Sequence, residues 1–386
     1  RMDWVSVGNW SYFTGIYPQE VVKAGIKDWR NAVGTGPFML KDYVSGATIT
    51  YEKNPNYWGT TKIGGKEYKL PFVDRLVWPI IVDESTQLAA LRTGKVDINE
   101  AVSYKYKDSL AQTNPELVRY KWLSSGFGAI AGRVDKKPFD DIRVRRALSM
   151  AIDRKAMINA LHGGEAQILS GPYSASWPEA LYTPLEKLPQ SARELFEYNP
   201  EKAKQLLTEA GYPKGFKTEM VITSTGTAMT DASAMLVDYW SKIGVTVELK
   251  PYDYAVYLSI QYGLTHKAMY YMSKGNGDPG VLWVIGRTPP YYWNPAMWDD
   301  KYFADTYDKA RGSDPTEAKK LLKALNVYMI DQCPYIIMPT GYSYSYAWPW
   351  VKNWYGELNA SVRAPGLIHA QIWIDRDLRE KMIGKR

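Results

Sequence analysis

Apolar and polar positions along the central part of the chain follow the periods of strands and helices in turn. Three apolar runs, KTEMVIT (217–223), VTVELK (245–250) and KAMYYMS (267–273), are each separated by a stretch with helical spacing. A strand–helix–strand–helix–strand order with right-handed crossovers makes the three strands parallel. The pattern therefore predicts an α/β fold with a parallel sheet in this region.

The flanking regions add further elements. The runs FMLKDYV (38–44) and ATITYEKN (47–54) alternate with period two around Ser45-Gly46, which predicts a β-hairpin. Apolar residues recur at helical spacing from 138 to Gly163-Gly164, which predicts one long helix. Other strands are expected at 73–82, 96–101, 117–123, 124–134, 335–339 and 371–374. Other helices are expected at 84–93, 200–210, 231–243, 254–262 and 315–332. The chain ends in a charged tail.

Composition and charge narrow the class of protein. The 386 residues are enough for two or three domains, and no apolar stretch is long enough to span a membrane. The net charge of +7 comes from basic residues interleaved with acidic ones, so nucleic-acid binding is not expected. A single cysteine and three scattered histidines predict no disulfide, no metal site and no histidine-based catalytic triad, and no cofactor is expected. The chain has 30 Tyr and 15 Trp but only 8 Phe, an excess of aromatic residues with a polar edge, which favours partly solvated recognition surfaces.

The strongest candidate for a binding site follows the third parallel strand. The strand 267–273 stops at Gly275-Asn276-Gly277-Asp278-Pro279, a cluster that cannot continue a strand. In open sheets of this kind, ligands bind beyond the carboxyl ends of the strands. We therefore expect Asp278, with Asn276 and Gly277, to lie over a crevice and hold a ligand without catalysing a reaction. The alternative is that Asp278 merely closes a turn before Pro279.

Several other residues are weaker candidates for ligand contacts. Arg287 could pair with a ligand carboxylate, although a solvated surface arginine has the same sequence signature. Tyr271, Trp283 and Trp293 could stack on a ligand, although core packing is the more frequent role of such residues. At the end of an earlier strand, Trp122, Ser124 and Ser125 are expected to face the same crevice.

Four stretches match one family in order and spacing. GTGPFMLKDYVSGATITYEKNPNYWG (34–59), PFDDIRVRRALSMAIDRKAMI (138–158), YNPEKAKQLLTEAGYPKGF (198–216) and the NGDP turn (276–279) resemble the family 5 extracellular solute-binding proteins of bacterial ABC importers. The resemblance implies a two-lobed periplasmic-binding-protein fold that closes on its ligand about a hinge. In peptide-binding relatives the aspartate of the turn pairs with the amino terminus of the ligand, and Asp278 would take that role here.

The resemblance also implies a domain organisation of the large, three-domain type. The chain would begin inside the inserted extra domain, with the N-terminal portion missing. Residues 1–33 would end that domain, 34–135 and 341–386 would form lobe one, and 136–340 would form lobe two. The expected hinge crossings lie at 133–137 and 338–341, where Gly132 and Gly341 suit backbone rotation and are equally compatible with ordinary turns.

The function implied is a receptor that captures a small peptide and delivers it to an ABC permease, as a monomer in the periplasm or at the extracellular face of the membrane, with a lipid anchor left open. An oligosaccharide receptor of the same fold is the main alternative, because stacked aromatics suit sugar faces. A nickel-chelate binder is disfavoured by the scarcity of histidine. A glycan-active enzyme would need paired carboxylates, and no such motif is present.

Overall fold

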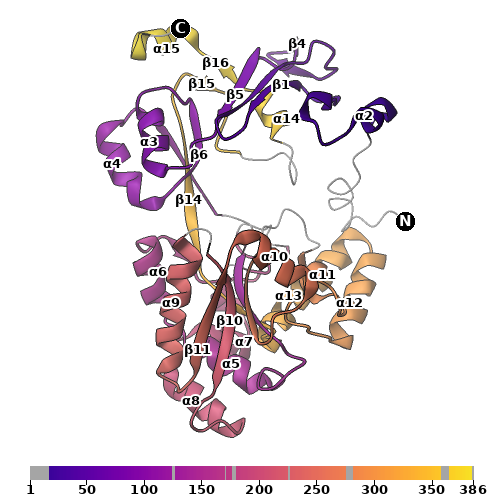
Figure 1. Cartoon of the computed structure of the whole chain (residues 1–386), viewed down its shortest axis with the longest axis vertical. Coiled ribbons are helices and arrows are strands. Elements are labelled where there is room, and N and C mark those ends of the chain that lie inside the picture. The colour runs from indigo at the N-terminus through magenta and orange to yellow at the C-terminus, as the bar shows by residue number, and fades with distance from the viewer. Residues whose placement is uncertain are drawn as a thin grey trace. The chain divides into compact units, whose positions relative to one another are not determined.

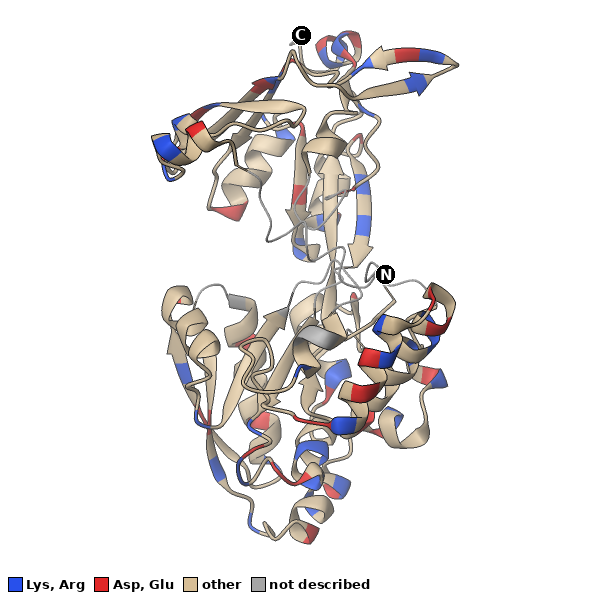
Figure 2. Ribbon diagram, turned by 90° about the vertical axis from the view of Figure 1, so that its right-hand side faces the viewer, with Lys and Arg blue, Asp and Glu red and all other residues tan. Residues whose placement is uncertain are grey.

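The computed structural model describes residues 17–123, 127–169, 171–175, 180–224, 227–274, 281–357 and 365–384. They form two compact units. Unit 1 comprises Leu123–Tyr342, and unit 2 comprises the described residues before Leu123 and after Tyr342. Lys and Arg are interspersed with Asp and Glu on both units (Figure 2).

Unit 1 is built around one mixed five-stranded sheet in the order β11-β10-β12-β8-β13. The parallel pairing of β10 with both β11 and β12 confirms the predicted parallel strands, whereas β8 is antiparallel to both β12 and β13. The strand bounds are β8 Phe127–Gly132, β10 Lys217–Thr223, β11 Thr246–Tyr252, β12 Met269–Lys274 and β13 Tyr335–Ile337.

Helices cover both faces of this sheet, and each face has its own apolar core (Figure 1). Successive strand residues point to opposite faces, so Met269 and Tyr271 of β12 enter one core while Tyr270 and Met272 enter the other. Four helices contribute side chains to the first core: α5 Ile142–Met150, α6 Arg154–His162, α8 Pro200–Glu209 and α9 Thr227–Ser241. Four others contribute to the second core: α10 Tyr254–Gly263, α11 Val281–Gly286, α12 Lys301–Gly312 and α13 Pro315–Gln332.

The prediction of one long helix over 138–164 is wrong. The chain forms α5 and α6 with a break after Met150, because Asp153 caps a new helix by accepting a hydrogen bond from the Ala156 amide at 2.9 Å. The break places Arg154 inside unit 1, where its guanidinium donates to the carbonyl oxygens of Ser149, Leu195 and Ile337.

Unit 2 contains two larger sheets, ordered β1-β2-β5 and β6-β14-β7. The antiparallel pairing of β1 with β2 confirms the predicted hairpin. The bounds are β1 Phe38–Val44, β2 Thr48–Lys53, β5 Arg75–Pro79, β6 Ile98–Val102, β7 Val118–Leu123 and β14 Thr340–Ala347, with small pairs formed by β3 Thr60–Ile63 with β4 Lys66–Lys69 and by β15 Val351–Lys352 with β16 Trp373–Ile374. The helices are α2 Gln19–Ala24, α3 Glu84–Arg92, α4 Lys107–Thr113, α14 Gly366–His369 and α15 Arg376–Ile383.

A cluster of aromatic side chains forms the core beside β14. The rings of Trp348 and Trp350 stack with centroids 4.4 Å apart, and Trp350 is completely buried. The expected charged tail is the helix α15, whose Leu378, Met382 and Ile383 pack against this cluster. Leu378 and Met382, four residues apart, lie on one helix face.

The chain passes between the units at Trp122/Leu123 and at Tyr342/Ser343. The sequence placed residues 127–132 in lobe one, but β8 pairs with β12 and β13 inside unit 1. The predicted crossing at 133–137 therefore lies within unit 1. The strand β14 pairs through Thr340 and Gly341 with β9 Ala166–Gln167 of unit 1, and through Tyr344–Ala347 with β6 of unit 2.

Candidate functional site

The carboxyl ends of β10 and β12 form a topological switch point. After β10 the chain enters α9, which packs in the first core against β10 and β11. After β12 it enters α11, which packs in the second core on the opposite face. Connections that leave two adjacent parallel strands in opposite directions open a crevice between the strand ends, where ligands of α/β sheets bind. The segments 275–280 and 225–226 follow these ends and lie outside the described residues.

The aromatic loop that follows α11 is held by a buried hydrogen-bond centre. Asn294 is fully buried, and its amide nitrogen donates to the carbonyl oxygens of Arg287 and Trp298 at 2.8 Å each. The hydroxyl of Tyr335 on β13 lies 2.9 Å from Asn294 Oδ1 and 2.7 Å from the Ile285 carbonyl oxygen. The loop and the end of α11 are thus fixed to the central sheet. Burial raises the pKa of Tyr335 well above its usual range, so the hydroxyl keeps its proton.

Two further contacts tie the same loop to α10 and to the segment after it. Gln261 donates to the carbonyl oxygen of Tyr292 at 3.3 Å, and His266 Nε2 lies 2.8 Å from that of Pro295. Burial is the main reason why the pKa of His266 falls to about 4, so its ring is neutral at pH 7 and Nε2–H donates.

Behind β12, a pair of tyrosines supports the strand. The rings of Tyr257 on α10 and Tyr270 stack with centroids 4.7 Å apart. The Tyr257 hydroxyl donates to the Tyr271 carbonyl oxygen at 2.7 Å, and the Tyr270 hydroxyl donates to that of Tyr257 at 3.0 Å. Burial raises the pKa of Tyr257 to about 12, so it too remains a donor at neutral pH. These contacts give the strand before the predicted ligand turn a rigid support.

Several predicted site residues lie outside what the structure describes. These are Ser124, Ser125, Asn276, Gly277 and Asp278, together with the side chain of Trp283, whose backbone belongs to α11. In the sequence, residues 275–280 stand between the end of β12 at Lys274 and the start of α11 at Val281.

The other candidates are distributed between the core and the surface. Tyr271 is 7% exposed and packs in the first core, where its ring lies against Gly128, so little of it is left for stacking on a ligand. Arg287 is exposed, with its guanidinium carbon 4.6 Å from the ring centre of Tyr291. Trp293 is half-buried against the second core, with its ring edge-on to Tyr262.

Trp122 belongs to unit 2. Its indole nitrogen donates to Ser345 Oγ at 2.9 Å, and that hydroxyl donates to the Glu100 carbonyl oxygen at 2.8 Å. The polar edge of Trp122 is therefore used inside the sheet β6-β14-β7.

Sequence reasoning missed Asn294, Tyr335 and His266, which position the loop. Tyr335 and Asn294 are 41 residues apart, and neither lies in a motif. The one local signal was Asn294-Pro295, a turn-forming pair inside an aromatic stretch.

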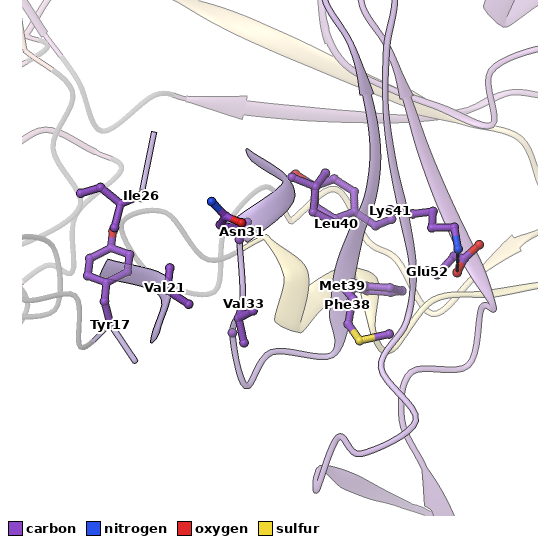
Figure 3. A pocket seen from close by; sticks show the side chains of 13 residues that line it. Tyr17, Val21, Ile26, Asn31, Val33, Phe38, Met39, Leu40, Lys41 and Glu52 are labelled. Carbon is purple, nitrogen blue, oxygen red and sulfur yellow. Dashed lines mark ion pairs between the residues drawn. The ribbon is translucent and has the colours of Figure 1, made fainter. Parts of the chain in front are cut away.

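A cavity with a volume of about 680 Å³ lies in unit 2. Tyr17, Val21 and Ile26 line one side and Phe38 to Lys41 of β1 the other (Figure 3). Its lining is mostly apolar, and the Lys41–Glu52 ion pair at 3.4 Å lies at its edge. None of the predicted ligand-binding residues lines it.

Among the described residues, no group of three or more His, Cys, Asp or Glu side chains is placed to hold a metal ion. In the same part of the chain, no helix has the length and apolar character needed to cross a bilayer.

Comparison with known proteins identifies one family. The model of bacterial extracellular solute-binding proteins, family 5 (middle) matches residues 8–289. The chain is 31% identical over 363 residues to heme-binding protein A of Haemophilus influenzae, which covers 90% of this chain and 60% of that protein. It is 28% identical to the dipeptide-binding protein of Escherichia coli over 83% of this chain and 59% of the relative. The chain thus spans about 60% of the length of the curated relatives it matches.

Solved structures of similar fold are two-lobed periplasmic binding proteins. DppA of Helicobacter pylori in complex with the peptide STSA superposes with a TM-score of 0.74 at 24% identity, over 93% of this chain and 68% of that one. HbpA2 of Haemophilus parasuis gives a TM-score of 0.69 at 22% identity, over 93% of this chain and 69% of that one. The predicted α/β fold of this class is thereby confirmed.

Proposed function

Because the chain belongs to the bacterial extracellular solute-binding proteins of family 5, we propose that it is a ligand receptor that captures a small peptide. The observation that carries the proposal is the switch point at the ends of β10 and β12. In the sequence, β12 is followed directly by residues 275–280, which include Asp278. Relatives named for dipeptides, di- and tripeptides and glutathione support a peptide as the ligand.

In this proposal Asp278 pairs with the amino terminus of the peptide. A carboxylate–ammonium hydrogen bond is charge-assisted and about twice as strong as a neutral one. Asn276 and Gly277 shape the turn. Arg287 and Trp293 are not assigned ligand contacts, because their loop is fixed near the start of β12 by the hydrogen bond from the Val134 amide to the Ala296 carbonyl oxygen, whereas Asp278 follows the end of that strand. Tyr271 acts through the core rather than by stacking on the ligand, because its ring is buried.

The remaining parts of the proposal follow the family. The protein catalyses no reaction, works as a monomer at the periplasmic or extracellular side of the membrane, and delivers its ligand to an ABC permease. The ligand leaves chemically unchanged.

The test is calorimetric titration of the 386-residue chain with di- to pentapeptides, each with a free or an acetylated amino terminus. Free peptides are expected to bind roughly 10- to 150-fold more tightly, the range for a hydrogen bond to a charged group. Asp278→Asn should remove that difference, whereas the exposed Asp299→Asn should keep it. Equal affinity for free and acetylated peptides would contradict the role of Asp278. Binding only of cello-oligosaccharides or nickel chelates in the same assay would replace the peptide as ligand.

A further inference from the structure

A second described cavity in unit 2, of about 240 Å³, shares Phe38 and Tyr51 with the larger one and has a histidine in its lining. It lies between the sheet β1-β2-β5 and the short helix α14. The side chains that define it are Phe38, Tyr51, Leu76, Trp78, Pro365 and His369. None of them was predicted to contact the peptide.

The strand register explains why its walls are aromatic. Tyr51 lies opposite Leu76 on β5 and opposite Leu40 on β1. Residues two apart on a strand share a face, so Trp78 joins Leu76 and Phe38 joins Leu40 on the face that carries Tyr51. Tyr51 and Trp78 meet edge-to-face with ring centroids 6.0 Å apart. One face of the sheet thus presents three aromatic rings to the cavity.

His369 supplies a polar group that nothing in the described structure satisfies. Its side chain is buried, with 5% of the residue exposed, and its ring meets Trp78 edge-to-face with centroids 5.7 Å apart. Nε2 lies 3.5 Å from Glu100 Oε1, whereas Nδ1 is buried without a hydrogen-bond partner among the described residues. Buried polar atoms are nearly always paired, so the orphaned nitrogen of a residue that lines the cavity calls for a partner.

The ring chemistry sets the kind of partner. A carboxylate beside Nε2 favours the tautomer that carries its proton there, which leaves a lone pair on Nδ1. A ligand would therefore offer an O–H or N–H donor. The volume is below the roughly 300–1,000 Å³ of pockets for drug-sized molecules, so only a molecule of one or two rings fits. Flat aromatic walls favour a planar ring.

We infer that this cavity is a binding site for a small planar aromatic molecule that carries one hydroxyl or N–H donor, which bonds to His369 Nδ1. This site is additional to the peptide site and does not depend on it. Its occupancy is therefore expected to be unchanged by Asp278→Asn.

The experiment compares phenol with anisole, and indole with 1-methylindole, by ligand-observed NMR titration of the 386-residue chain. Each pair shares a ring and differs in the donor. Phenol and indole are expected to bind roughly three- to tenfold more tightly than their methylated partners, the range for one neutral hydrogen bond. The ¹⁵N resonance of His369 Nδ1 should shift with phenol and stay in place with anisole.

Three variants locate the site. His369→Phe keeps a ring but removes the acceptor, so it should abolish the preference for phenol. Leu76→Trp fills the cavity while leaving His369 in place, and should abolish binding of all four probes. Leu367→Trp adds the same bulk at an exposed position of α14 outside the lining, and should change nothing. Absence of binding, equal affinity within each pair, or binding unaffected by Leu76→Trp would each overturn the inference. The first two outcomes are read on the unmodified chain and need no variant to fold.

Discussion

The Tyr335 hydroxyl and the Asn294 carboxamide oxygen lie 2.9 Å apart, both fully or nearly buried, and join the central sheet of unit 1 to the loop after α11. Tyr335→Phe removes a hydroxyl whose single proton lies between two buried acceptors, Asn294 Oδ1 and the Ile285 carbonyl oxygen, and so leaves one of them short of a donor. We expect the free energy of unfolding to fall by ~1–3 kcal/mol, measured by urea denaturation. Tyr302→Phe, at a largely exposed ring on α12, is the matched control and should cost under ~0.5 kcal/mol. Equal losses would contradict a special role for the Tyr335 hydroxyl.

His266 should make the stability of unit 1 depend on pH. Its pKa is about 4 in the folded chain against an ordinary value of 6.5, so the unfolded chain binds the proton first as pH falls. The contribution is complete above pH 6.5 and is lost as pH drops towards 4, by up to about 3 kcal/mol. Urea denaturation from pH 7.5 to pH 4 measures this loss. His266→Gln should show a shallower decline over that interval, and parallel curves for the two proteins would show that His266 is not responsible.

The buried Arg154 is expected to be among the most sensitive positions in unit 1. Burial lowers its pKa to about 10, so it stays charged at neutral pH and donates to three main-chain carbonyl groups. Arg154→Met leaves those buried oxygens without donors and should cost at least ~3 kcal/mol by denaturant unfolding. Arg193→Met, which removes a partly exposed ion pair with Glu197 and an exposed hydrogen bond to Gln190, should cost under ~1 kcal/mol. A loss at Arg154 no larger than at Arg193 would refute this account.

The imidazole ring of His162 leaves no room for a side chain at Gly341 on β14. A Cβ atom there would lie 2.4 Å from His162 Nδ1 at the end of α6. Gly341→Ala should therefore destabilise the fold by ~1–3 kcal/mol, whereas Gly312→Ala, with open space around it, should not. Adding His162→Ala should recover part of the Gly341→Ala loss in a double-mutant cycle. Additive effects of the two changes would show that the clash is not the cause.

Local patterns predicted the elements that carry their own signals. The helices expected at 200–210 and 315–332 are α8 and α13. Each is preceded by a cap residue, Asn199 or Asp314, whose side chain accepts main-chain hydrogen bonds. A signal that was present but overlooked is Gly64-Gly65, both at positive φ, which joins β3 to β4.

What the sequence could not supply is the pairing of distant segments. The position of β8 between β12 and β13, antiparallel to both, could not be predicted. A strand that is buried on both faces is a continuous apolar run, and such a run does not indicate the direction of its neighbours. The contacts of Arg154 with Leu195 and Ile337 are likewise set by packing. The break between α5 and α6 was legible only as Asp153, a cap residue inside an otherwise helical pattern.

The three anchors of the aromatic loop, at Tyr292, Asn294 and Pro295, affect more than stability. A segment that becomes ordered only on association loses conformational entropy at that moment, which weakens the complex. Here that entropy is already lost when the chain folds, since the anchors belong to the sheet, to α10 and to the segment that follows it. A guest at this edge of the sheet, where β12 begins and the Val134 amide donates to the Ala296 carbonyl oxygen, would meet a preorganised wall. Residues 275–280, which contain Asp278, follow the other end of β12.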